Sequence, residues 1–291
     1  MSTATTAAAA APPRALPAAA ADGFADAAAY DAHRPSYPPA AVDAFLSRLS
    51  LTAPSAPAGQ GRRVVEVAAG TGKFTEVLAA RPEGFEVLAV EPHEGMRAEL
   101  RRKGLAGVQV REGFAAEMPV ESGWGDGAVA AQAWHWFANE ESLAEIHRVL
   151  KPGAKFGMIW NVEDYNKPAS WKATTSWEKL LNEWIFERDD GLPRFRDEQW
   201  RAVFARQKDS PSPLFSAPPA EERVPWTVWL SEDALWARFN TLSQVAVLKG
   251  EERAAAERTF REAMAMEDVE RNERGEVAVH GVTFFAWTER L

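Results

Sequence analysis

The chain has 291 residues, 46% of them hydrophobic, which is enough for one large domain or for one domain with a modest cap. It contains no cysteine, so disulfides, thiolate zinc sites and a cysteine nucleophile are excluded. The formal net charge of −9 disfavours a nucleic-acid partner, and no stretch approaches the roughly 20 apolar residues that cross a bilayer. We therefore expect a soluble, cytoplasmic protein with no nucleic-acid or membrane partner.

The chain begins with residues 1–24, which are mostly Ala, Thr and Pro and predict a disordered tail. Residues 25–60 predict a helical segment that closes over the site as a lid. Within it, Tyr30, Arg34 and Tyr37 are candidate substrate contacts if the segment folds over the mouth of the pocket. The alternative is that the Arg-Pro and Tyr-Pro pairs are ordinary turn residues.

From residue 61 to residue 162, strand-like and helix-like segments alternate in the βαβ manner. Glu91-Pro92 ends the second strand, and Asn139 is the expected N-cap of the helix before the fifth. Five strands with short crossovers imply a parallel sheet covered on both faces. The expected strands are 64–67, 85–90, 108–110, 128–131 and 156–160.

After residue 162 the pattern changes. Residues 163–222 place tryptophans at helical spacing before a proline-rich stretch, which predicts a helical insertion over the functional edge of the sheet. Residues 223–291 predict a return to the sheet, with a strand at 224–230, a helix capped by Ser231 and a last strand at 277–287. We expect the last strand to be broken or bulged near Gly281.

The run 66–73 (EVAAGTGK) places an acid at the end of the first strand and small residues in the turn that follows. Small residues let the backbone approach a ligand closely, and the next helix supplies free N–H groups. The run therefore predicts a nucleoside-binding loop, although a glycine turn can also be plain turn chemistry. The small residues are Ala68, Gly70 and Gly72.

Three classes of nucleotide site compete for this loop. A P-loop is excluded because Val67 stands where its first glycine belongs and Phe74 where its hydroxyl belongs. A dinucleotide loop stays open, because the small residues have G-x-G-like spacing and Glu91 follows roughly 20 residues later. Glu66 favours a cofactor with an ammonium and a sulfonium, since its carboxylate would repel a pyrophosphate.

Six segments resemble, in order, the motifs of class I S-adenosylmethionine (SAM)-dependent methyltransferases, and in particular a subgroup that includes trans-aconitate methyltransferase-like proteins. The resemblance covers about residues 28–162. It implies an α/β fold with a doubly wound, Rossmann-like sheet of seven strands, mostly parallel with a C-terminal antiparallel hairpin, and a helical cap. It also implies SAM as the cofactor. The segments are 30–38, 66–73, 89–92 with Met96, 113–119, 131–137 and 148–153.

The resemblance carries roles for individual residues. Glu66, Gly70 and Gly72 hold the methionine end of SAM, and Glu91 accepts hydrogen bonds from both ribose hydroxyls. Phe114 replaces the usual small or acidic residue beside the adenine. The full cofactor-binding set is Glu66, Ala68, Gly70, Gly72, Glu91, Pro92, Met96, Phe114, Ala115 and Gln132.

His135 is the candidate catalytic residue for the methyl acceptor. It follows the fourth strand, at the edge where open α/β sheets bind ligands. An imidazole there can act as a general base for a phenol, hydroxyl or amine, with local hydrogen bonding as the alternative. Trp136 and Trp160 are candidate substrate contacts, and core packing is the alternative. Arg194 and Arg196 are expected to be exposed, with a clamp on an acidic substrate as the alternative. The histidines are scattered, so no metal site is expected.

The sequence thus predicts a methyltransferase that acts on a small-molecule acceptor by in-line displacement. O-methylation of a carboxylate or hydroxyl is favoured, and a carboxylate would need no general base. Two alternatives remain, an NAD-type oxidoreductase on a similar fold and a SAM-binding regulatory protein without catalysis.

Overall fold

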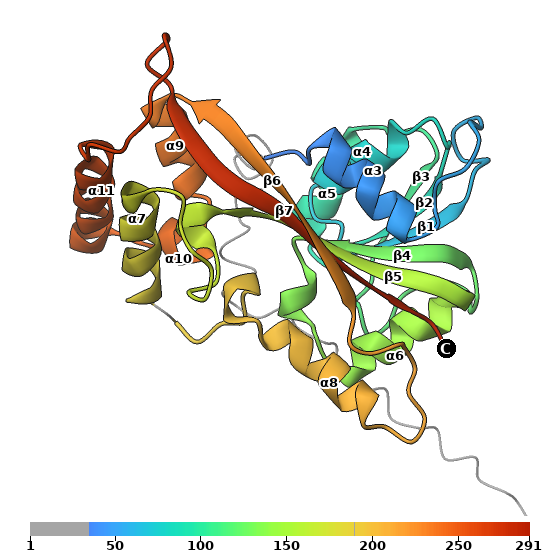
Figure 1. Cartoon of the computed structure of the whole chain (residues 1–291). Coiled ribbons are helices and arrows are strands. Elements are labelled where there is room, and N and C mark those ends of the chain that lie inside the picture. The colour runs from blue at the N-terminus through green and yellow to red at the C-terminus, as the bar shows by residue number, and fades with distance from the viewer. Residues whose placement is uncertain (1–34, 189) are drawn as a thin grey trace, which may run out of the picture.

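The computed structural model describes residues 35–188 and 190–291, and these form a seven-stranded sheet in the order β3-β2-β1-β4-β5-β7-β6 (Figure 1). The predicted tail 1–24 and the candidate contacts Tyr30 and Arg34 lie outside the described residues. The strands are β1 (Arg63–Val67), β2 (Glu86–Val90), β3 (Val108–Arg111), β4 (Gly125–Ala131), β5 (Leu150–Glu163), β6 (Ala220–Leu230) and β7 (Val277–Glu289).

Strands β1 to β5 pair in parallel, and β7 pairs antiparallel with both β5 and β6. The predicted α/β fold with a mostly parallel sheet and a C-terminal antiparallel pair is confirmed. The strand order reverses between β1 and β4, which start crossovers in opposite directions. Such a reversal leaves a crevice at the carboxyl ends of the strands, and this crevice is where open sheets bind ligands.

Helices cover both faces of the sheet, with α3 and α4 on one face and α6 and α8 on the other. Two predicted caps are present: Asn139 Oδ1 accepts from Ser142 N at 2.8 Å, and Ser231 Oγ accepts from Ala234 N at 3.2 Å. The helices are α3 (Pro39–Arg48), α4 (Lys73–Ala79), α5 (Glu94–Arg102), α6 (Glu140–Val149), α7 (Ser176–Phe186), α8 (Ala202–Lys208), α9 (Glu232–Phe239), α10 (Ser243–Ala246) and α11 (Gly250–Met264). Short 3₁₀ turns are η1 (Trp134–Trp136), η2 (Asp164–Asn166), η3 (Phe195–Asp197) and η4 (Gln199–Arg201). Among the described residues, no helix is both long enough and apolar enough to span a membrane.

Helix α3 belongs to the core and corrects part of the lid prediction. Its Phe45 is fully buried and packs edge-on against Phe285, with 5.5 Å between ring centroids. The same ring lies over Gly157 so closely that a Cβ there would come within 2.6 Å of it. Helix α3 is therefore packed on the sheet, because its apolar side chains fill part of that face.

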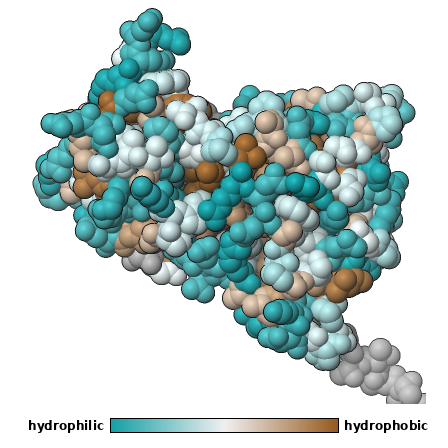
Figure 2. Space-filling model, in the orientation of Figure 1, coloured by the Kyte–Doolittle hydropathy of each residue, from teal (hydrophilic) through white to brown (hydrophobic). Residues whose placement is uncertain are grey.

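A second group of helices forms what we call the distal lobe, made of α7, α9, α10 and α11 together with the ends of β6 and β7 that they cover (Figure 1). It has its own core, in which Trp177, Phe239 and Val277 are fully buried. Figure 2 shows the surface of the whole protein in the orientation of Figure 1. Most of this surface is hydrophilic, and hydrophobic residues appear on it in small groups. In this lobe β6 and β7 continue as a strand pair beyond Glu163, the last residue of β5.

Strand β7 runs without interruption through Gly281, so the predicted break there is wrong. Gly281 pairs in register with Glu163 of β5 and with Trp226 of β6. A Cβ at this position would lie 2.4 Å from Cη2 of Trp226. The glycine is present because the indole of Trp226 lies over it, and a bulge is not needed.

Candidate functional site

The loop after β1 makes the tight turn that its small residues predict. Ala68, Gly70 and Gly72 have φ values of 55°, 60° and 89°, all in the left-handed region. Ala69 N donates to Val90 O at 3.1 Å, which ties the loop to the end of β2. A left-handed conformation costs roughly 1–2 kcal/mol for a residue with a Cβ, so Ala68 is held there by the surrounding contacts.

The two glycines of this loop serve different needs. A Cβ on Gly72 would lie 2.3 Å from Cδ1 of the buried Leu100, so Gly72 lets α4 start close against α5. A Cβ on Gly70 would come no closer than 3.7 Å to Met96 Sδ. Gly70 is therefore required by its backbone angle alone.

Glu91 fastens the loop from the neighbouring strand end. Its two carboxylate oxygens accept from Gly70 N at 2.9 Å and from His93 N at 2.8 Å. Burial raises the pKa of Glu91, and the two amide hydrogen bonds oppose that rise. Each oxygen can accept one further hydrogen bond, so the carboxylate is able to receive a pair of hydroxyls.

Glu66 lies at the end of β1 and is 1% exposed. Its Oε2 accepts from Thr75 Oγ1 at 2.7 Å. Burial raises its pKa to about 8, so the carboxyl is mostly protonated at neutral pH. A cation brought close would favour the charged form, and the group therefore fits a positively charged ligand.

Helix α5 begins beside this loop. Its first turn contains Arg97, which the sequence analysis did not identify as a site residue. His93 Nδ1 caps the helix by accepting from Met96 N at 3.3 Å, and Met96 faces Gly70. Buried Arg97 donates to the carbonyl of Glu91 at 3.0 Å and also to that of Pro92. Arg97 thus holds the Glu91-Pro92 turn in place.

Phe114 and Ala115 follow β3 and are partly buried. Glu117 N donates to Phe114 O at 2.9 Å, which closes a short turn there. Phe114 therefore places an aromatic ring after β3, where the resembling methyltransferases carry a small or acidic residue.

A cavity lies where the carboxyl ends of β4 and β5 meet the insertion and the distal lobe, and we call it the edge cavity. Gln132, with φ 56°, donates through Nε2 to Asn161 O at 2.8 Å and so links the two strand ends. The lining residues are Gln132, His135, Trp136, Asn161, Val162, Asn166, Arg194, Phe195, Arg196, Thr241, Leu242, Ser243 and Gln244.

His135 lines the edge cavity with a defined tautomer. Its Nδ1 is 3.1 Å from Nε1 of Trp160. An indole N–H can only donate, so Nδ1 is the acceptor and the proton of the neutral ring is on Nε2. The general-base role predicted for His135 is therefore disfavoured, because protonation of Nδ1 would break this hydrogen bond.

The candidate substrate contacts differ in how deeply they are buried. Trp160 is 0% exposed and packs against Phe195 and Trp200, with centroid distances of 4.9 and 5.0 Å, so its predicted substrate role is wrong. Tyr37 is buried and packs edge-on against Phe74 at 5.0 Å. Trp136 does line the edge cavity.

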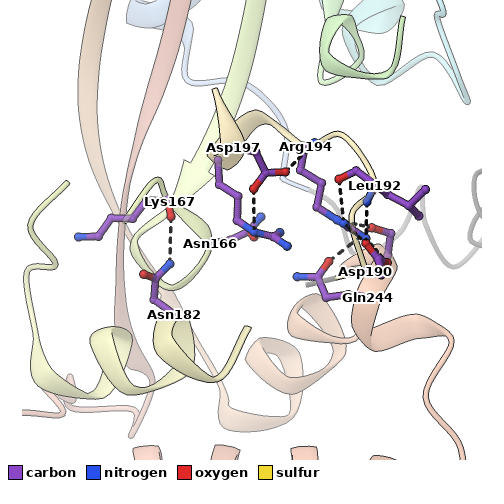
Figure 3. A network of polar contacts seen from close by, with 10 residues as sticks. Asn166, Lys167, Asn182, Asp190, Leu192, Arg194, Asp197 and Gln244 are labelled. Carbon is purple, nitrogen blue, oxygen red and sulfur yellow. Dashed lines mark hydrogen bonds and ion pairs between the residues drawn. The ribbon is translucent and has the colours of Figure 1, made fainter. Parts of the chain in front are cut away.

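Arg194 and Arg196 are 5% and 4% exposed, which corrects the expectation that they face solvent. Arg194 Nη2 contacts Asp190 Oδ2 at 2.7 Å, and Arg196 Nη1 donates to Asn166 Oδ1 at 3.3 Å (Figure 3). Polar partners inside the protein thus hold both arginines.

Gln244 belongs to the distal lobe and was not predicted. It is buried in the edge cavity, and its Nε2 has no hydrogen-bond partner within the described part of the chain. No local sequence signal marks it, because only the fold brings α10 to the ends of β4 and β5. In the described ranges we find no group of three or more His, Asp or Glu side chains able to hold a metal ion.

Comparison with known proteins places this geometry in context. Residues 65–158 match the family model for a methyltransferase domain. An uncharacterized methyltransferase-like protein of Schizosaccharomyces pombe is 37% identical over 180 residues, which is 62% of this chain and 63% of that protein. An uncharacterized methyltransferase of Mycobacterium tuberculosis is 39% identical over 136 residues, which is 47% of this chain and 50% of that protein. The chain thus spans about half to just under two thirds of the length of these relatives.

Solved structures show the same fold at low identity. The YcgJ protein from Bacillus subtilis superposes with a TM-score of 0.52 at 16% identity, covering 86% of this chain and 98% of that one. A candidate type II methyltransferase from Anaeromyxobacter dehalogenans has a TM-score of 0.54 at 22% identity, covering 87% and 97%. These similarities concern the fold alone.

Proposed function

Residues 65–158 form a class I SAM-dependent methyltransferase domain whose cofactor is SAM, and from this premise we propose that the protein methylates a small molecule bound in the edge cavity. SAM supplies an electrophilic methyl group on a sulfonium. The observation that carries the proposal is the position of the edge cavity at the carboxyl ends of β4 and β5, beside the strand-order reversal, where open α/β sheets bind ligands.

The cofactor side of the proposal rests on two carboxylates. Glu91 would accept from the ribose hydroxyls while it keeps its amide contacts to the loop. Glu66 would ionise beside the cationic end of SAM, because a nearby positive charge offsets the cost of burial. A pyrophosphate would gain nothing from Glu66, which argues against an NAD-type enzyme.

For the acceptor we favour O-methylation, and a carboxylate over a hydroxyl. The described lining of the edge cavity contains no Asp or Glu side chain, and the hydrogen bond from Trp160 leaves the proton of the neutral His135 ring on Nε2. A carboxylate oxygen is already a nucleophile, attacks the methyl carbon as the sulfonium bond breaks, and has no proton to lose. A hydroxyl would need a base, and this lining offers donors such as Arg196 and Gln244.

Calorimetry tests the cofactor assignment. We expect wild-type protein to bind SAM and S-adenosylhomocysteine and not NAD. Glu91→Ala should weaken SAM binding roughly tenfold or more, because it removes two charge-assisted hydrogen bonds that organise the loop. The matched control is Glu121→Ala, an exposed carboxylate before β4. Binding of NAD without SAM would contradict the assignment.

A pair of substitutions tests the role of His135. His135→Gln keeps an N–H donor toward the cavity and His135→Ala does not. If His135 is a donor, turnover of a carboxylate acceptor, followed as S-adenosylhomocysteine release, should be retained far better by the glutamine variant. Equal loss in both variants would favour the base role. A screen of carboxylates, phenols and amines in which nothing turns over would favour a SAM-binding regulator.

The cytoplasmic location and the absence of a nucleic-acid partner remain predictions from the sequence.

A further inference from the structure

A second cavity lies between the segment that follows β5 and the outer part of the β6–β7 pair, and we call it the hairpin cavity. It shares no lining residue with the edge cavity. The two cavities are separated by η2 and the residue after it, because Asn166 lines the edge cavity and Lys167 lines the hairpin cavity. Figure 3 shows the Lys167 side chain pointing away from the arginines of the edge cavity.

Lys167 is unusual for a lysine because it is 2% exposed. Its ammonium has no hydrogen-bond partner in the described part of the chain. The nearest acidic oxygen, Asp164 Oδ2, is 3.8 Å away and already accepts from Thr174 N at 2.7 Å. An ammonium taken out of water without hydrogen bonds is costly, so this group is suited to a ligand that supplies acceptors.

The charges around Lys167 favour an anion. Lys172 and Arg223 also line the hairpin cavity, whereas Asp164 is the single acidic residue in its described lining, and the buried Glu178 behind that lining also acts electrostatically on Lys167. Arg223 lies over the ring of Trp171, with its Cζ 3.8 Å from the centroid, which holds the guanidinium at the rim. This concentration of cations stands out in a chain whose net charge is −9.

We propose that the hairpin cavity binds a small oxyanion, a phosphate or carboxylate group, with the Lys167 ammonium as its buried donor and Lys172 and Arg223 at its rim. The anion would replace the water that the ammonium lost on folding with charge-assisted hydrogen bonds. The site is separate from the cavity assigned to the methyl acceptor, and its occupancy does not depend on methyl transfer.

The test is titration of the full chain with inorganic phosphate and, separately, with citrate, at constant ionic strength and followed by calorimetry. We expect saturable binding of at least one of them. Lys167→Met, which keeps the side-chain length and removes the charge, should weaken that binding roughly tenfold, the value of one charged hydrogen bond. Lys179→Met, at an exposed lysine of α7, is the matched control and should bind as wild type does.

The failure of both anions to bind, or binding that Lys167→Met leaves unchanged, overturns the proposal. If Lys167→Met does not fold, the exposed pair Lys172→Met and Arg223→Gln replaces it, and unchanged binding in that double variant also overturns the proposal. SAM titration of the same variants should match wild type, which separates this result from the proposed methyl transfer.

Discussion

Two glutamates at neighbouring strand ends show how surroundings divide the roles of one side chain. Glu66 is buried and accepts from the Thr75 hydroxyl, whereas Glu91 accepts from two backbone amides. Burial raises the pKa of both carboxyls, and at Glu91 two backbone amides oppose that rise. The first is suited to respond to a cation and the second to accept hydroxyls.

The raised pKa of Glu66 predicts a pH-dependent stability. In the unfolded chain its pKa is near the ordinary 4.5, and in the folded chain it is about 8. Between these values the folded protein keeps a proton that the unfolded chain has lost. The free energy of unfolding should therefore fall as pH rises from 5 to 8 and level off above that range.

Urea denaturation at several pH values measures this effect. Glu66→Gln should remove most of the fall, and Glu121→Gln, at an exposed position, should leave it in place. Parallel pH curves for wild type and Glu66→Gln would show that burial does not perturb this carboxyl.

Among the elements, the loop between β1 and α4 depends on close packing as much as on backbone freedom. Gly72 starts α4 where the side chain of Leu100 from α5 leaves no room for a Cβ. Gly70, two residues earlier, adopts a left-handed angle, and a Cβ there would make only an ordinary van der Waals contact with Met96. A pattern of small residues predicts the turn but does not distinguish these two causes.

The distinction predicts unequal costs for the same substitution. Gly70→Ala should destabilise the protein by about 1 kcal/mol, the strain of a left-handed alanine. Gly72→Ala should cost roughly 3 kcal/mol, because the clash with buried Leu100 adds to that strain. Chemical denaturation of the two variants, each the control for the other, checks the order. Equal losses would mean that Leu100 moves aside freely.

On the scale of the whole molecule, the distal lobe is joined to the sheet where β5 ends and β7 continues. Beyond Glu163, the edge of β7 that β5 leaves open is met by Glu178 of α7, which is fully buried and accepts from His280 N at 2.8 Å. The same carboxylate lies 3.1 Å from His280 Nδ1. One side chain thus replaces the missing strand and anchors the lobe that closes the edge cavity.

Removal of this anchor should loosen the distal lobe more than the parallel sheet. Glu178→Ala should cost about 3 kcal/mol, because it removes a buried, hydrogen-bonded carboxyl group and leaves a strand amide unpaired. Hydrogen exchange should then increase in α7 and at 277–280 while β1 and β4 stay protected. Glu183→Ala, at an exposed position of α7, is the control. Uniform loss of protection would show that the lobe and the sheet unfold together.

The sequence by itself determined the alternation of strands and helices in residues 61–162, the caps at Asn139 and Ser231, and the placement of Glu66 and Glu91 at strand ends. These features depend on neighbours a few residues apart, and local patterns of apolar, small and capping residues record them.

The tertiary structure alone decided what meets around the edge cavity. It turned Arg194 and Arg196 inward, brought Gln244 to the ends of β4 and β5, and set the tautomer of His135 through Trp160. Each of these contacts joins segments distant along the chain, and burial and hydrogen bonding between such segments depend on how the layers pack. No periodicity within one segment carries that information.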